Sequence, residues 1–195
     1  MSDHRSAPRR RGDALVTAIL DATLGEIADH GYAALTMDQV ARRAGASKAS
    51  LYRRWPSPVP LVVDAVYHAL PTAQLPDEGS LRADVLGVLR QVVRQLDGPA
   101  GSALRGLHGD ALRDPAVAEQ IHRVSRGHAL AIMTTVVDRA VSRGECHPES
   151  VTIRRLEAGP ALVRHHFLMT GTPPSDGYLV EVVDEVVLRL FTGRD

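Results

Sequence analysis

The sequence has one cysteine, few aromatic residues and no long apolar run. Because Cys146 is the only cysteine among 195 residues, no disulfide can form within the chain, which is typical of a reducing compartment. No apolar run approaches the ~18 residues of a membrane span, and no apolar segment of a secretion signal follows the arginine-rich N-terminus. These absences exclude a disulfide-stapled secreted domain and a membrane protein, and they predict a cytoplasmic protein.

Net charge is also absent, but the charges are unevenly distributed. The chain contains 23 Lys and Arg against 23 Asp and Glu, so no field of one sign covers the whole protein. Residues 1–55 nevertheless contain nine basic and six acidic side chains, and the remainder is acidic by the same margin. A basic N-terminal part is typical of a protein that binds nucleic acid at that end.

Apolar residues recur at helical spacing in the N-terminal third. Four helices are predicted there, over residues 13–30, 37–44, 48–55 and 57–71. Thr36 and Gln39 form a capping box before the second helix, Gly45 ends that helix, and Ser47 caps the third. These helices define a predicted first domain over residues 13–71.

The rest of the chain is predicted to be helical, with no strand. Five helices are expected, over residues 81–96, 102–112, 115–143, 148–170 and 175–191. Pro160 predicts a bend, since an interior proline removes a backbone hydrogen bond. The last helix is rich in valine, which favours a strand, but its three- and four-residue spacing favours a helix. The protein is therefore predicted to be all-α, with a helical bundle over residues 80–195.

Two short helices joined by Gly45 and Ala46 form a predicted helix-turn-helix over residues 36–55. The second helix of this motif enters the DNA major groove. Small residues such as Ala46 and Ala49 allow a close approach to DNA, and side-chain donors suit phosphate oxygens. The donors on the second helix are Ser47, Lys48, Ser50, Tyr52 and Arg53. An ordinary helical hairpin is the simpler alternative.

Residues 35–55, LTMDQVARRAGASKASLYRRW, closely resemble the helix-turn-helix of the TetR family of one-component bacterial repressors, and with the flanking helices the resemblance covers residues ~13–70. It implies an all-helical homodimer whose variable C-terminal domain binds a small molecule and forms the dimer. It also implies that Thr36, Lys48, Ser50 and Tyr52 contact phosphates or the groove and that residues 46–49 read bases. The candidate DNA-binding residues are thus Thr36, Arg42, Ala46, Ser47, Lys48, Ala49, Ser50, Tyr52 and Arg53.

The sequence departs from the family just after the aromatic residue Trp55. The family usually has a lysine two or three residues later, which begins the fourth helix and contacts phosphate, whereas Pro58, Val59 and Pro60 occupy that turn here. Residues 1–12 form a predicted flexible basic arm. It is either a solvated tail or a DNA-contacting arm of the kind that homeodomains use.

Other classes of function have less support. The adjacent His165 and His166 point ~100° apart on a helix, and Cys146 has only His147 nearby, so no metal site is predicted. An enzyme is the second hypothesis, but the sequence has no glycine-rich phosphate loop and no nucleophile elbow. We expect no cofactor.

Two roles are predicted for the C-terminal domain. An apolar cavity between the helices over residues 81–96, 115–143 and 148–170 would bind an effector, with the candidate lining residues His108, His128, Met133, Arg164 and His165. The two C-terminal helices would form the dimer through Val163, Phe167, Thr170, Leu179, Val183, Val187 and Leu190.

The sequence thus predicts a repressor that binds a near-palindromic operator as a homodimer and is released by a small molecule. The alternative is a DNA-binding dimer whose C-terminal domain binds no effector.

Overall fold

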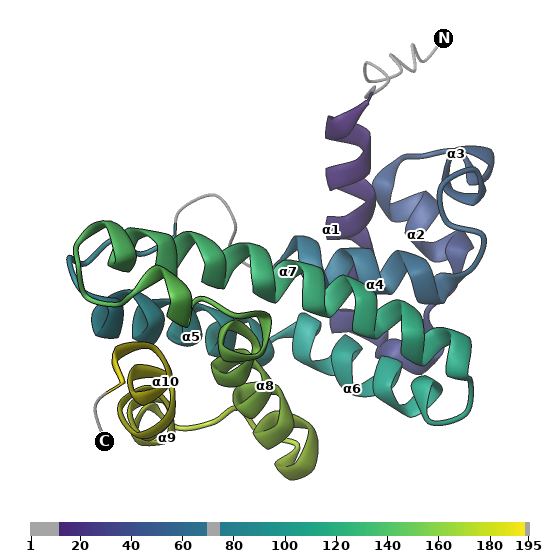
Figure 1. Cartoon of the computed structure of the whole chain (residues 1–195). Coiled ribbons are helices and arrows are strands. Elements are labelled where there is room, and N and C mark those ends of the chain that lie inside the picture. Colours follow the sequence, from purple (N-terminus) through teal and green to yellow (C-terminus); the bar gives the residue numbers. More distant parts are fainter. Residues whose placement is uncertain (1–11, 70–74, 194–195) are drawn as a thin grey trace, which may run out of the picture.

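The computed structural model describes residues 12–69 and 75–193, and these ranges contain helices and no strand (Figure 1). The N-terminal helices are α1 (Asp13–His30), the 3-10 helix η1 (Tyr32–Ala34), α2 (Met37–Ala44), α3 (Lys48–Tyr52) and α4 (Pro58–His68). The all-α prediction is confirmed. The predicted basic arm lies outside the described residues, except for Gly12.

The C-terminal helices are α5 (Leu81–Leu96), α6 (Pro99–Ala111), α7 (Pro115–Ser142), the 3-10 helix η2 (Pro148–Ser150), α8 (Ile153–Thr170), α9 (Asp176–Glu181), the π-helical segment η3 (Val182–Val187) and α10 (Leu188–Thr192). Figure 1 shows α7 running along the bundle, with α1, α2 and α3 gathered beside one end. We call residues 13–55 the head and residues 75–192 the body. No helix among the described residues has the length and hydropathy needed to cross a membrane.

Several helix boundaries differ from the sequence prediction. The predicted helix over residues 102–112 begins earlier, at Pro99, because a proline fits the first turn of a helix, where its missing N–H is not needed. The predicted helix over residues 148–170 begins later, because Thr152 caps α8: its Oγ1 accepts a hydrogen bond from the Arg155 N–H at 3.5 Å. This helix continues through Pro160 to Thr170. The third helix is shorter than predicted and ends at Tyr52.

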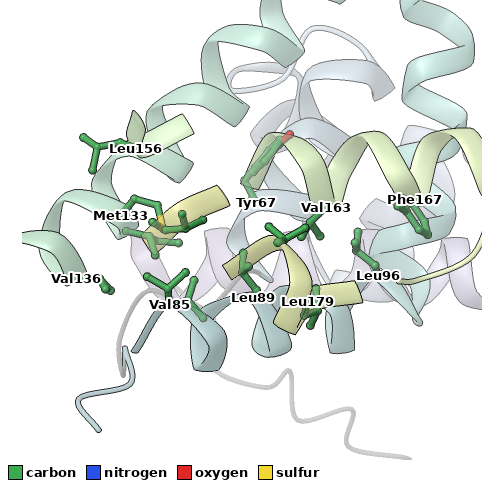
Figure 2. Close-up of a cluster of buried hydrophobic side chains, with 14 of the residues drawn as sticks. Tyr67, Val85, Leu89, Leu96, Met133, Val136, Leu156, Val163, Phe167 and Leu179 are labelled. Carbon is green, nitrogen blue, oxygen red and sulfur yellow. The ribbon is translucent and has the colours of Figure 1, made fainter. Parts of the chain in front are cut away.

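Two apolar cores meet at α4. Leu61 and Ala65 pack into the core of the head, whereas Val62, Val63 and Val66 of the same helix pack into the core of the body. Figure 2 shows part of the body core, with side chains from α4, α5, α7, α8 and α9. Because α4 is buried on two faces, the head cannot move relative to the body without repacking this helix.

Polar contacts hold the segment that leads into α5. Arg139 Nη1 donates a hydrogen bond to the Pro76 carbonyl at 2.9 Å, and the Glu78 N–H donates to Asp84 Oδ1 at 2.5 Å. Asp84 is fully buried, and its other carboxylate oxygen lies 2.8 Å from Arg143 Nη2. A buried carboxylate is tolerated when it is paired and hydrogen-bonded in this way.

The C-terminal helices pack into the body of their own chain. Five of the predicted dimer residues are at most 1% exposed here: Val163, Phe167, Leu179, Val183 and Val187. They therefore lack the exposed surface that a partner chain would contact directly, and the wide valine stripe faces the protomer's own core. Thr170 is exposed, and Leu190 is half-buried. Two salt bridges add to this packing. Arg82 Nε lies 2.7 Å from Asp184 Oδ1, and Arg90 Nε lies 2.6 Å from Asp176 Oδ1.

Candidate DNA-binding surface and candidate ligand cavity

A left-handed glycine joins α2 to α3. Gly45 has φ 62° and ψ 33°, a conformation that costs an L-residue energy but that glycine adopts freely. The Ala46 N–H then donates to the Ala41 carbonyl at 2.9 Å, which closes the end of α2. Thr36 caps α2 and Ser47 caps α3, their hydroxyls accepting the Gln39 and Ser50 N–H groups at 3.3 and 3.2 Å. These contacts fix the angle between the two helices.

The inner face of the motif packs on α1 and α4. Val40, Ala41, Leu51 and Trp55 are buried, as expected of the residues that hold a helix-turn-helix together. Trp55 Nε1 donates a hydrogen bond to Asp64 of α4 at 2.7 Å. The motif is therefore held rigidly on the helix that also enters the body core.

The candidate DNA-binding residues form the outer face of α2 and α3. The exposed members of the predicted set are Thr36, Arg42, Ser47, Lys48, Ala49, Tyr52 and Arg53, and the half-buried members are Ala46 and Ser50. Tyr52 is 50% exposed although it is a large aromatic residue, so packing alone does not explain its position.

The cations of the head fall into two groups. Arg43 is held against α1, with Nη1 2.7 Å from Asp29 and 3.2 Å from Glu26, and its hydrogen bond lowers the pKa of the Asp29 carboxyl. In the described part of the chain, by contrast, the exposed Arg42, Arg53 and Arg54 form no ion pair with a carboxylate. Arg54 directly follows Arg53 but is not among the residues predicted from the sequence.

Two features reduce the number of free donors for phosphate on this surface: the ion pair of Lys48 and the prolines at the start of α4. Lys48 Nζ lies 2.6 Å from Asp38, and both side chains are more than half exposed, so solvent weakens this pair. At the start of α4, Pro58 and Pro60 have no N–H, which leaves fewer free donors than a helix start usually presents to a phosphate.

A cavity lies inside the body, where α4, α5, α6, α7 and α8 meet. Its volume is about 80 Å³ and its lining is mostly aliphatic, including Val88, Leu104 and Ile132. Three residues of the predicted set contribute to the lining: His128, Met133 and Arg164. The other two lie elsewhere. The periodicity of the sequence could not separate a cavity face from a core face.

The two histidines outside the lining have other environments. His108 is half-buried on α6, where its Nδ1 lies 2.9 Å from the Leu104 carbonyl oxygen, one turn earlier in the helix. His165 is exposed on the outer side of α8.

Five side chains with polar atoms lie at the cavity among apolar ones: Tyr67, Gln95, Ser125, His128 and Arg164. Arg164 Nη1 donates a hydrogen bond to Ser125 Oγ at 2.7 Å. His128 packs against the ring of Tyr67 with the ring centres 5.8 Å apart, and burial lowers the pKa of His128. The imidazole of His128 is therefore neutral at neutral pH.

A contact that the sequence did not reveal connects the head to α6. Tyr32 of η1 donates its hydroxyl to Asp110 Oδ2 at 2.5 Å. Its ring lies so close to α6 that a Cβ at Gly106 would come within 2.2 Å of it. Since Ala100 and Leu104 of α6 also line the cavity, this helix touches both the cavity and the head.

The structure brings few candidate metal ligands together. Within residues 12–69 and 75–193, no group of three or more His, Cys, Asp or Glu side chains could hold a metal ion.

Comparisons with known proteins agree with this architecture. The family described as "Bacterial regulatory proteins, tetR family" matches residues 19–58, and the family described as "Tetracyclin repressor-like, C-terminal domain" matches residues 75–186. The HTH-type transcriptional regulator Rv1556 of Mycobacterium tuberculosis is 31% identical over 177 residues, which cover 90% of this chain and 87% of that protein.

Two further relatives span nearly the whole chain. The DNA-binding transcriptional repressor TetR of Mycobacteroides abscessus is 28% identical, over 93% of this chain and 96% of its own length. The crystal structure of the TetR family transcription regulator SCO0332 superposes with a TM-score of 0.74 at 28% identity, covering 90% of this chain and 97% of that one. With its helix-turn-helix in α2 and α3 and a helical C-terminal domain, the chain belongs to the TetR family of DNA-binding transcriptional regulators.

Proposed function

We propose that the protein is a repressor that binds a near-palindromic operator as a homodimer and is released by a small-molecule effector. The observation that carries the DNA-binding part is the outer face of α2 and α3, where exposed arginines have no carboxylate partner in the described chain. Proteins of this family bind operator DNA as dimers, and the relative from Mycobacteroides abscessus is named a repressor. A cytoplasmic location, where operator DNA is found, belongs to the same proposal.

In this proposal α3 lies in the major groove, with residues 46–49 nearest to the bases. The hydroxyls of Thr36, Ser50 and Tyr52, together with Lys48, would contact phosphates, which fix the position of the helix without reading sequence. Arg42, Ser47, Ala49 and Arg53 complete the contact surface. The dimer would place its two copies of α3 ~34–36 Å apart, one turn of DNA.

The outer face of α8 is the surface that best suits the dimer. Small and apolar side chains recur there at helical spacing and are accessible to solvent: Ala158, Ala161, Leu162, Leu168 and Met169. Met169 is 69% exposed, which is unusual for an apolar side chain of its size. Thr170 and Leu190 can join this surface directly. The buried valines of η3 would support it from inside the protomer.

The cavity supports the effector part of the proposal. Its walls include α4, which is shared with the head core, and α6, which contacts Tyr32 of the head. A ligand larger than about 80 Å³ must displace these walls and would alter the position of the heads. Such coupling typically amounts to about 1–3 kcal/mol. If the body binds no effector, no small molecule will raise the melting temperature, which separates the two alternatives.

The DNA-binding part is tested by selecting genomic fragments with the purified protein. We expect enrichment of a few near-palindromic sites and, by sedimentation, two chains on each site. Arg53→Ala should abolish the enrichment, whereas Arg189→Ala, which removes an exposed arginine from α10, should retain it. Enrichment of no site by the folded wild-type protein would contradict the proposal.

A further inference from the structure

The lining of the body cavity contains one permanently charged side chain, and it lacks a counterion. Arg164 donates to Ser125 Oγ, but no carboxylate of the described chain lies within ion-pair distance of it. Nearby arginines differ, because Arg126 and Arg154 both pair with Glu157, at 2.5 and 2.9 Å. A half-buried guanidinium without a carboxylate partner remains available to pair with an anion that enters the cavity.

A second polar group at the cavity is unpartnered. His128 Nε2 is buried and has no hydrogen-bond partner among the described residues. Ser125 and His128 are three residues apart on α7 and therefore share one face of that helix. The side chains of Ser125 and His128 thus extend from the same face of α7, and both line the cavity.

We propose that the cavity binds an apolar molecule with a single carboxylate, which pairs with Arg164 and accepts a hydrogen bond from His128 Nε2–H. This inference rests on the proposed function, since it names the chemical class of the effector. The planar guanidinium can donate two parallel hydrogen bonds to one carboxylate, which fixes the orientation of the ligand. The aliphatic walls then enclose the rest of the molecule. A cationic ligand would be repelled by Arg164, and an uncharged one would leave it without a counterion.

The size of the cavity limits the first probes. At about 80 Å³ it is smaller than the ~150 Å³ apolar cavity that holds benzene in another protein. Short acids should enter with little rearrangement, whereas longer ones must displace α4 or α6. A series of increasing length therefore measures both recognition and the displacement of the walls.

The test uses calorimetry with the full-length protein and paired ligands. The acids are the straight-chain series from butanoate to decanoate, with phenylacetate as the aromatic member, and each is compared with the alcohol of the same skeleton. We expect the best acid to bind at least about ten-fold more tightly than its alcohol, as a charge-assisted hydrogen bond provides. Tighter binding of the straight-chain acids would indicate a fatty-acid-like ligand, and tighter binding of phenylacetate would indicate an aromatic acid.

Substitutions at Arg164 test whether this side chain causes the preference for acids over alcohols. Arg164→Gln should weaken binding of the acid by about ten- to a hundred-fold and change the affinity for the alcohol by less than about three-fold. The preference for the acid is then lost. Arg164→Lys should retain part of the preference because it keeps the charge. Arg123→Gln, which removes an exposed arginine from α7, is the matched control and should change neither affinity. Melting temperatures without ligand confirm folding, and His128→Phe provides a second variant if Arg164→Gln is unstable.

Three results would overturn the inference: equal binding of acid and alcohol, an acid preference that survives in Arg164→Gln, or no binding by any member of the series. Operator binding by the same ligand-free preparation is measured in parallel. If DNA binding is retained while the acids fail, only the inference is overturned. If DNA binding also fails, the proposed function fails with it.

Discussion

In the head, polar side chains of α2 and α3 face solvent, whereas in the body those of Ser125, His128 and Arg164 face a small apolar cavity. The first arrangement offers many weak contacts to a large polyanion, and each contact is available without a change of structure. The second offers a few contacts that become accessible only when the walls of the cavity admit a ligand. Under the proposed function, the head binds DNA in one conformation and the body responds to a ligand.

The connection between the two regions consists of tightly packed parts. α4 contributes to both cores, and Tyr32 of the head contacts Asp110 and Gly106 of α6. Close-packed interiors transmit displacement because they have few voids to absorb it. Changes to the head, the body or the connection should therefore have effects of different kind and size.

The largest expected effect comes from a charge in the body core. Val183→Asp places a carboxylate where the wild-type side chain is 0% exposed, which should cost more than about 4 kcal/mol and abolish cooperative unfolding. Thermal unfolding followed by circular dichroism is the measurement. Thr170→Asp, at an exposed position nearby, should leave the protomer folded. A well-folded monomeric Val183→Asp variant would instead place Val183 at a subunit interface.

A smaller loss is expected from the buried carboxylate at the start of the body. Asp84→Asn removes the charge that pairs with Arg143 and should lower the free energy of unfolding by about 2–3 kcal/mol. Asp77→Asn is the matched control, because Asp77 is 62% exposed and lies 3.4 Å from the same arginine. It should change stability by less than about 0.5 kcal/mol. Equal effects in urea unfolding would mean that burial does not distinguish the two carboxylates.

The connection itself is tested by Tyr32→Phe, which removes one hydroxyl. Loss of the hydrogen bond to Asp110 should lower stability by about 1 kcal/mol. It should also reduce the factor by which an effector weakens operator binding, since α6 then loses a polar contact with the head. Fluorescence anisotropy with and without ligand measures that factor. An unchanged factor would mean that this hydrogen bond does not couple the cavity to the head.

The smallest effect is a pH dependence that arises in the body. Burial lowers the pKa of His108 and His128 below the ordinary 6.5, so the folded state binds fewer protons than the unfolded state as pH falls. Stability should therefore decline as pH falls from about 7.5 through 6.5 and below. His128→Phe should reduce this slope, whereas substitution of the exposed His122 by Gln should not. A stability that is flat between about pH 7.5 and 5.5 would contradict it.

The sequence predicted the head better than the body for a physical reason. Thr36, Gly45 and Ser47 act on the residues next to them in the chain, so their caps and turn could be predicted locally. The outer face of a short surface helix also follows directly from its period. The boundaries of α2 agree with the prediction from Met37 to Ala44.

In the body, the same periodicity predicts where the helices lie in the sequence, but it does not predict which neighbours each helix face contacts. Val183 and Val187 lie on a helical stripe, as predicted, and within the protomer that stripe is buried. The cavity is assembled from five consecutive helices, so spacing within one helix could not separate His128, which lines it, from His165, which is exposed. The contact between Tyr32 and Asp110 joins residues 78 positions apart and left no local pattern.

The central claim, that the outer face of α2 and α3 binds DNA, is tested most directly by the salt dependence of operator affinity. A selected fragment is titrated with wild type, Lys48→Ala and Tyr52→Phe at several salt concentrations. We expect both variants to bind more weakly. The slope of log K against log salt should be shallower by about one unit for Lys48→Ala and unchanged for Tyr52→Phe, because only the lysine carries charge. Wild-type affinity and wild-type slope in both folded variants would contradict the account.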